Sequence, residues 1–160
     1  MIYSVWAEPA TQDAKYLLKI IRSLGEKYSA PTFRPHITLY GGVRNMSSVM
    51  TAIRNCGARK FSVHTKSLDF SDSVWKTVFV NVERNRQMQK INNAIKEVAS
   101  NQYDFSPHMS LIYKKMDNST KQKIINDLKI KGKFTFDKIT IIVSSKVVSE
   151  WKVVDRLVLK

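Results

Sequence analysis

Two short segments of the sequence carry the same pairing of a histidine with a hydroxyl side chain. Residues 35–39 read Pro-His-Ile-Thr-Leu, and residues 107–111 read Pro-His-Met-Ser-Leu. Alternate residues of a β-strand point to the same face. In each segment we therefore expect the histidine and the hydroxyl to share one face of a strand, while the apolar residues between and after them face a core.

This pair of motifs suits the hydrolysis of a cyclic phosphodiester. The reaction needs a base that takes a proton from water and an acid that gives one to the leaving oxygen. Imidazoles titrate near neutral pH and can fill both roles, and hydroxyls can donate hydrogen bonds to the phosphate oxygens on which charge develops. Since each motif supplies one imidazole and one hydroxyl, we expect both motifs to meet at one site. The predicted catalytic residues are His36, Thr38, His108 and Ser110.

A lone histidine at the start of a strand is more often structural than catalytic. The repetition of the motif favours the catalytic interpretation, because chance rarely gives two histidines with the same neighbours. His64 lacks the pattern, and we expect it to be a solvent-facing strand residue. The sequence has no His-x-x-x-His segment, no pair of cysteines and no carboxylate cluster beside either motif, so we expect neither a metal nor a cofactor.

The elements that position the motifs follow a repeated order. Apolar spacing predicts two successive β-α-β-α-β units and a final strand. The expected strands are residues 2–7, 36–40, 61–70, 77–82, 108–113, 134–143 and 151–158. The expected helices are residues 13–28 and 88–99, one capped by Ser47 or Ser48 that runs to about residue 56, and one capped by Asn118 or Ser119 that runs to about residue 128. We interpret Gly41 and Gly42 as a turn.

Each unit carries its histidine at the start of its middle strand. A pseudo-twofold arrangement would bring the two middle strands side by side across a cleft. We therefore predict an α+β fold and a single bilobal domain over residues 1–160. Lobe one would span about residues 1–70 and lobe two about residues 71–160, with strand exchange between them left open.

Composition limits the partners of this domain. The sequence has 27 Lys and Arg against 13 Asp and Glu, a net charge of +14, which attracts nucleic acid, nucleotides or anionic membranes. The single cysteine, Cys56, excludes an intrachain disulfide. Residues 2–6 show no signal-peptide pattern, and apolar runs such as residues 141–143 are too short to span a bilayer. We expect a cytoplasmic monomer with no membrane partner.

The two motifs resemble those of the 2H phosphoesterase superfamily, which is named for paired His-x-Thr/Ser motifs. Within it, the chain looks most like the cyclic phosphodiesterases. The similar segments are residues 3–7, 33–38, 107–113 and 151–154. The resemblance implies two antiparallel sheets that enclose a cationic cleft. It also implies metal-free hydrolysis of nucleoside 2′,3′-cyclic phosphates to 2′-phosphates and of ADP-ribose 1″,2″-cyclic phosphate to the 1″-phosphate.

The same resemblance assigns roles within the site. It implies that His108 is the base toward water, that His36 is the acid toward the leaving oxygen, and that Tyr113 binds substrate. Strict alternation puts Tyr113 on the face opposite His108, so the strand must end or bulge for that role to hold. Trp75 is a candidate for stacking on a nucleobase, with core packing as the equal alternative.

Two other functions stay open at this point. The same site could act on RNA ends or 2′,5′-linked oligonucleotides, as other 2H branches do, and the positive charge favours that reading. The chain could instead be a phosphate- or RNA-binding module without turnover. The two histidines disfavour the binding module, because Arg or Lys would serve binding alone better.

Overall fold

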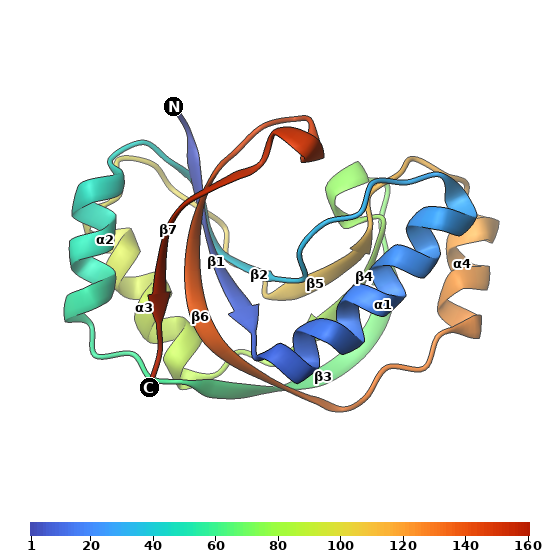
Figure 1. Ribbon diagram of the computed structural model, residues 1–160, viewed down its shortest axis with the longest axis horizontal. Coiled ribbons are helices and arrows are strands. Elements are labelled where there is room, and N and C mark those ends of the chain that lie inside the picture. The colour runs from blue at the N-terminus through green and yellow to red at the C-terminus, as the bar shows by residue number, and fades with distance from the viewer.

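The computed structural model describes all 160 residues, and its elements alternate between strands and helices (Figure 1). The strands are β1 (Tyr3–Pro9), β2 (Ile37–Val43), β3 (Phe61–Phe70), β4 (Val78–Val82), β5 (His108–Ile112), β6 (Lys133–Val143) and β7 (Lys152–Val158). The helices are α1 (Thr11–Tyr28), α2 (Met46–Asn55), α3 (Arg86–Val98) and α4 (Asn118–Asp127), with 3₁₀ turns η1 (Val74–Lys76) and η2 (Val148–Glu150). The order is β-α-β-α-β twice, followed by β7, as the sequence predicts.

All strand pairs are antiparallel, and the strands form one strongly bent sheet. Its order is β2-β1-β6-β3-β4-β5, with β7 paired to β6. The first part of β3 pairs with β6 and its second part pairs with β4. The long strands β3 and β6 therefore join two lobes, which lie on either side of a central opening (Figure 1). The predicted α+β fold is confirmed.

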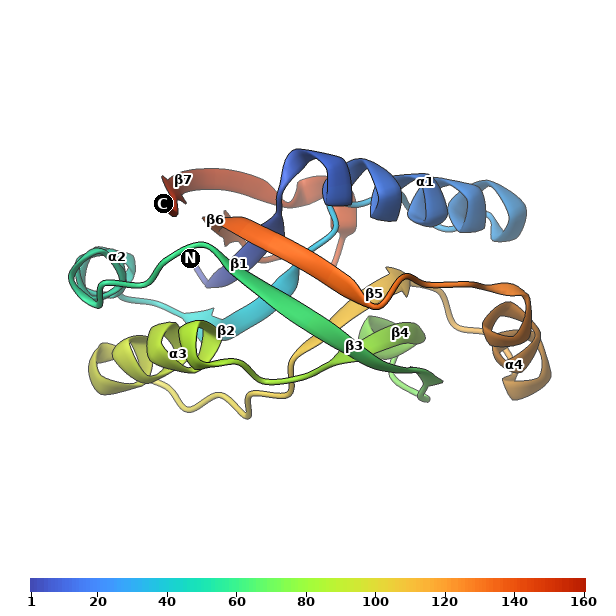
Figure 2. The same cartoon turned by 90° about the horizontal axis from the view of Figure 1, so that it is seen from below.

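The sequence repeat divides the chain near residue 70, whereas the packing interleaves its elements. Helix α1 belongs to the first half of the sequence but packs against β5, and α3 belongs to the second half but packs against α2 and β2. Figure 2 shows α2 and α3 together at one end of the molecule and α4 at the other. Each lobe is therefore built from both halves of the chain.

The turn predicted at Gly41 and Gly42 is wrong, because both glycines lie within β2. Tyr3 pairs with Val43 and Val5 pairs with Tyr40. Between these two pairs β2 advances by three residues while β1 advances by two, so β2 contains one extra residue. This extra residue is a β-bulge, and Gly42 takes φ +74° there, which costs glycine nothing.

The predicted helix caps are also displaced. Helix α2 begins at Met46 after Asn45, whose side chain bonds the Val98 carbonyl instead of capping the helix. Helix α4 is capped by Asp117, whose carboxylate accepts the Thr120 amide at 2.8 Å. Asn45 lies two residues before Ser47, and Asp117 lies one residue before Asn118, so both helices begin earlier than the sequence predicts. No helix is both long and apolar enough to cross a bilayer.

Alternation along the central strands separates the core from the cleft. Val5 and Ala7 are fully buried on one face of β1, while Ser4 and Trp6 line the cleft on the other. Ile37 and Leu39 of β2 are likewise fully buried, and Thr38 between them faces the cleft. Each buried aliphatic side chain contributes roughly 1.5 to 3 kcal/mol to folding, so the core fixes which side chains face the cleft.

Candidate active site

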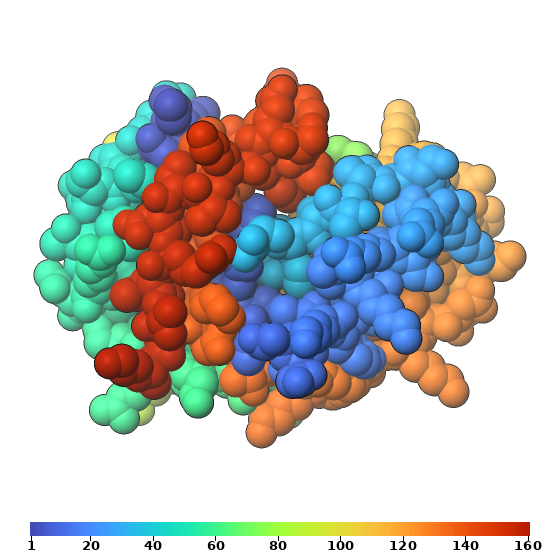
Figure 3. Space-filling view, in the orientation of Figure 1, coloured from blue at the N-terminus to red at the C-terminus, as the bar shows by residue number.

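A cleft of about 410 Å³ lies between the two lobes, and Figure 3 shows the hollow between the segment around η2 and the segment that leads into β2. Its walls contain every site residue that the sequence predicts. These are His36, Thr38, His108, Ser110, Tyr113 and Trp75. The other lining residues are Ser4, Trp6, Gly41, Ser73, Lys76, Tyr103, Ile142, Ser144, Ser145 and Trp151. The fold therefore brings the two motifs together at one site.

The two histidines are held in the same way. Nδ1 of His36 lies 2.7 Å from the Arg34 carbonyl, and Nδ1 of His108 lies 2.7 Å from the Ser106 carbonyl. A carbonyl oxygen only accepts hydrogen bonds, so each Nδ1 carries a proton and donates it. In the neutral ring Nε2 then holds the lone pair that can accept a proton. In each motif a proline, with its fixed φ, stands between the carbonyl and the histidine.

His36 is the more enclosed of the two. It is 6% exposed, and its ring stacks on Trp6 with the centroids 3.6 Å apart and the planes 9° from parallel. Burial lowers the pKa of His36 to about 4, against the opposing effects of the Arg34 carbonyl and the Glu8 carboxylate. His36 is therefore neutral at physiological pH.

His108 is more open and has a different charged neighbour. Burial lowers its pKa, the Ser106 carbonyl opposes that effect, and the positive charge of Lys76 lowers the pKa further. Lys76 is the only Lys or Arg that lines the cleft. The expected cationic cleft thus contains one permanent positive charge, and most of the net charge of +14 lies elsewhere on the surface.

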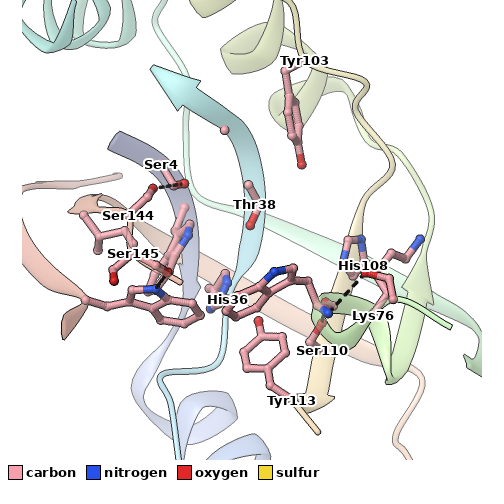
Figure 4. A pocket seen from close by; sticks show the side chains of 16 residues that line it. Ser4, His36, Thr38, Lys76, Tyr103, His108, Ser110, Tyr113, Ser144 and Ser145 are labelled. Carbon is pink, nitrogen blue, oxygen red and sulfur yellow. Dashed lines mark hydrogen bonds between the residues drawn. The ribbon is translucent and has the colours of Figure 1, made fainter. Parts of the chain in front are cut away.

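The two hydroxyls are not equivalent. Thr38 makes no side-chain hydrogen bond to the protein, so its hydroxyl is free to donate to a ligand (Figure 4). Ser110 donates its hydroxyl proton to the Trp75 carbonyl at 3.0 Å. Before Ser110 can donate to a phosphate oxygen, its hydroxyl must turn away from that carbonyl.

Tyr113 reaches the cleft because β5 bulges and then ends. Phe79 pairs with Ser110 and Val78 pairs with Ile112, so β5 contains one extra residue between these pairs. The bulge reverses the alternation, and the strand ends at Ile112. Tyr113 therefore lies on the same side as His108 and lines the cleft. Burial raises the pKa of Tyr113, so its phenol stays protonated and can donate a hydrogen bond.

Trp75 and Trp151 form an aromatic wall on one side of the cleft. Trp75 lies in η1 and is 38% exposed. Its ring packs at 5.8 Å from Trp151 and edge-on to Tyr113 at 5.3 Å. Trp151 is oriented by a hydrogen bond of 2.8 Å from its indole nitrogen to the Ser145 carbonyl. Trp75 thus lines the cleft with part of its ring exposed, which disfavours the alternative that it packs in the core.

Sequence reasoning missed several lining residues, among them Trp151 and Tyr103. Figure 4 shows the Tyr103 hydroxyl directed toward the space between Thr38 and His108. A Cβ at Gly41 would stand 3.2 Å from the Tyr103 ring. A glycine at position 41 indicates that another group approaches the backbone closely there. Only the folded structure shows that this group is the Tyr103 ring.

The remaining sequence interpretations concern residues outside the cleft. His64 is exposed on β3 as expected, with Nδ1 3.9 Å from a Glu83 carboxylate oxygen. Cys56 is half-buried just after α2. The ammonium group of Lys114 donates a hydrogen bond to the Tyr28 carbonyl. No group of three or more His, Cys, Asp or Glu side chains is arranged to hold a metal ion.

Solved structures share this fold over almost the whole chain. The protein TT0787 of Thermus thermophilus superposes with a TM-score of 0.67 at 11% identity and covers 99% of this chain and 98% of its own. Escherichia coli LigT, solved in complex with 3′-AMP, gives a TM-score of 0.64 at 13% identity, with 99% and 97% covered. Usb1 of Kluyveromyces marxianus gives 0.52 at 10% identity, with 95% and 96% covered. At these identities the likeness shows the fold alone.

Sequence comparison identifies the family. No curated protein matches the chain, but the model of the 2′-5′ RNA ligase superfamily matches residues 5–147, which contain both histidine motifs. With the fold and the paired motifs in one cleft, this match shows that the chain belongs to the 2′-5′ RNA ligase superfamily of 2H phosphoesterases.

Proposed function

We propose that this protein is a metal-independent cyclic phosphodiesterase that acts on small cyclic phosphates. The substrates we propose are nucleoside 2′,3′-cyclic phosphates, opened to 2′-phosphates, and ADP-ribose 1″,2″-cyclic phosphate, opened to the 1″-phosphate. The observation that carries this proposal is the matched pair of imidazoles. Both have Nδ1 tied to a backbone carbonyl, and both line one cleft beside a hydroxyl.

The proposed reaction transfers one proton at each histidine. Nε2 of His108 takes a proton from water as the water oxygen forms a bond to phosphorus. Nε2 of His36 gives a proton to the 3′ oxygen as its bond to phosphorus breaks, which leaves the 2′-phosphate. Among the neighbouring charges, Glu8 favours a protonated His36 while Arg34 and His108 oppose it, and Lys76 favours a neutral His108. The phosphodiester anion raises the pKa of both imidazoles when it binds, so His36 can be charged in the complex.

Hydrogen-bond donors beside the imidazoles would stabilise the transition state. The free hydroxyl of Thr38 and, after rotation, that of Ser110 would donate to the non-bridging oxygens. The protonated phenol of Tyr113 would supply a third donor. Trp75 and Trp151 would pack against the base or the ribose of the nucleotide.

The dimensions and charge of the cleft favour a small substrate. A volume of about 410 Å³ lies in the range of small-molecule sites, and a single lysine in the lining suits a nucleoside 2′,3′-cyclic phosphate, which carries one negative charge. The fold neighbour LigT was solved in complexes with 3′-AMP and with phosphate. We propose that the protein acts as a monomer, because one chain supplies both histidines and both hydroxyls of the site.

A second candidate is a 2H enzyme that acts on RNA ends or 2′,5′-linked oligonucleotides. The match to the RNA ligase family model and the net charge of +14 favour it. Lysines and arginines outside the cleft would then contact further phosphates, and binding would weaken steeply as the salt concentration rises.

Phosphorus NMR distinguishes the two candidates. The protein is mixed with a nucleoside 2′,3′-cyclic phosphate and excess EDTA, with His108→Ala as the blank and His64→Ala as a matched surface control. Conversion to the 2′-phosphate by the wild type and by His64→Ala, but not by the blank, supports the cyclic phosphodiesterase. A folded wild type that converts no cyclic nucleotide but cleaves or joins an oligonucleotide from an RNA panel supports the second candidate.

A further inference from the structure

A buried carboxylate lies beside the active site. Glu8 of β1 is 6% exposed and stands two residues after Trp6, on the same face of the strand. It does not line the cleft, and it takes no part in the proton transfers described above. A buried ionised carboxylate is costly unless it is paired and hydrogen-bonded, so its partners indicate what it does.

Both oxygens of Glu8 are occupied. Oε2 accepts two hydrogen bonds from the Arg34 guanidinium, at 3.0 Å from Nε and 2.7 Å from an Nη. Oε1 accepts the Thr140 hydroxyl and lies 3.5 Å from Arg156. Burial raises the pKa of Glu8, but these hydrogen bonds and charges outweigh burial and hold the pKa below its ordinary value. Glu8 is therefore ionised at neutral pH.

Arg34 connects this carboxylate to the catalytic histidine. Its side chain is held by Glu8, and its backbone carbonyl accepts the proton on Nδ1 of His36 at 2.7 Å. Pro35, between the two residues, restricts the backbone. The ion pair therefore holds the residue whose carbonyl decides which ring nitrogen of His36 is protonated.

The second motif lacks such a support. Nδ1 of His108 donates to the Ser106 carbonyl at the same distance of 2.7 Å, but Ser106 is exposed and makes no ion pair. The chain thus contains two equivalent imidazole–carbonyl contacts, of which only one is supported by a buried carboxylate. The contact at His108 therefore serves as an internal control: changes at Glu8 or Arg34 should affect the His36 ring and leave the His108 ring unchanged.

We propose that Glu8 is a positioning residue for His36, which acts through Arg34 to keep the proton on Nδ1 and leave Nε2 toward the cleft. This role deepens the proposed function, since it assigns a residue that prepares one of the two catalytic imidazoles. Outer partners that orient metal-ligating histidines typically account for a tenfold to hundredfold effect on activity, and we expect an effect of about that size here.

Long-range proton–nitrogen NMR of the histidine rings tests the proposal directly, because it reports which ring nitrogen carries the proton. The wild type should show His36 and His108 with protonated Nδ1 at pH 7. In Glu8→Gln, which keeps the shape of the side chain but removes its charge, His36 should populate the tautomer protonated on Nε2, while His108 should stay unchanged. Asp155→Asn, which breaks the exposed Arg54–Asp155 ion pair at 3.4 Å, is the matched control and should leave both rings unchanged.

Arg34→Met provides the second variant in case Glu8→Gln does not fold. It removes the same ion pair, while Glu8 keeps Thr140 and Arg156 as partners. It should change the His36 tautomer in the same direction as Glu8→Gln. A folded variant of either kind in which His36 keeps the wild-type tautomer would overturn the proposal.

Kinetics give an independent readout. With a cyclic nucleotide, Glu8→Gln should lower kcat about tenfold to hundredfold and change KM by less than about threefold. Adding Arg34→Met to Glu8→Gln should lower kcat little further, because both changes remove the same Glu8–Arg34 ion pair. Fully additive losses of kcat would contradict the proposal. The NMR result does not require turnover, so a wild type without cyclic phosphodiesterase activity would refute the proposed function and leave the role of Glu8 to be judged by the tautomers.

Discussion

The imidazole of His36 lies flat on the indole of Trp6, with the ring centroids 3.6 Å apart and the planes 9° from parallel. Trp6 pairs across the strands with Thr38, so the β1–β2 register sets this stack and places the Thr38 hydroxyl beside it. The stack shields one face of the imidazole from water, which contributes to the burial that lowers the pKa of His36 to about 4. The same contact thus orients the ring and adds to the burial that keeps it neutral.

Removing either imidazole should nearly abolish turnover. His36→Ala and His108→Ala should each lower kcat by at least about a thousandfold, since each deletes one proton-transfer group. His64→Ala removes an exposed histidine far from either motif in the chain and should keep wild-type activity. Steady-state kinetics on folded variants, verified by circular dichroism, measure this. Full activity in either catalytic variant would exclude the two-histidine mechanism.

The two hydroxyls should contribute unequally. Thr38→Val keeps the shape of the side chain and removes a hydroxyl that has no protein partner, so kcat should fall by about a hundredfold to a thousandfold. Ser110→Ala should cost less, on the order of tenfold, because the hydroxyl must first break its 3.0 Å bond to the Trp75 carbonyl. Comparing kcat for the two variants checks the order. A larger loss for Ser110→Ala would show that its hydroxyl already faces the substrate in the resting enzyme.

The local arrangement of the site could be predicted from the sequence because it depends on short-range rules. The period of two along a strand puts His36 with Thr38 and His108 with Ser110, and the repeated order of elements predicts that these strands meet. The bulge at Gly42 depends on how β2 pairs with β1, and the bulge in β5 depends on its pairing with β4. The sequence of one strand does not determine the register of its pairing with another strand, so neither bulge could be predicted.

The residues that sequence reasoning missed come from distant parts of the chain. Trp151 lies next to Trp75 only because β6 and β7 return to the cleft, and Tyr103 reaches it only because Gly41 leaves room for the ring. The exchange of α1 and α3 between lobes is likewise a matter of packing. Helical spacing shows that a face is apolar, but not which sheet it covers.

Trp75 should bind the base of the substrate. Trp75→Ala should raise KM for a nucleoside 2′,3′-cyclic phosphate about tenfold, since stacking contributes roughly 1 to 3 kcal/mol per base. For a cyclic phosphate without a base, such as glycerol 1,2-cyclic phosphate, KM should stay within about twofold of the wild type. Kinetics on both substrates measure the difference. Equal effects on the two substrates would mean that Trp75 supports the cleft walls and does not stack on the base.

The free energy of unfolding should depend on pH through His36. Its pKa is about 4 in the folded protein and near the ordinary value of 6.5 in the unfolded chain. Between these values the unfolded chain binds a proton that the folded protein does not, so stability is complete above pH 6.5 and falls as the pH drops toward 4. The loss due to His36 amounts to about 3 kcal/mol at its limit.

His36→Gln isolates this contribution, because glutamine does not titrate while Glu8 and His108 remain in both proteins. Both of these groups also have lowered pKa values and destabilise the fold as the pH falls, so the wild type and the variant share their effects. Urea denaturation at several pH values between 7.5 and 4 should therefore show a steeper loss for the wild type than for His36→Gln. Parallel curves would mean that His36 keeps an ordinary pKa in the folded protein, and that the stack on Trp6 leaves it open to water.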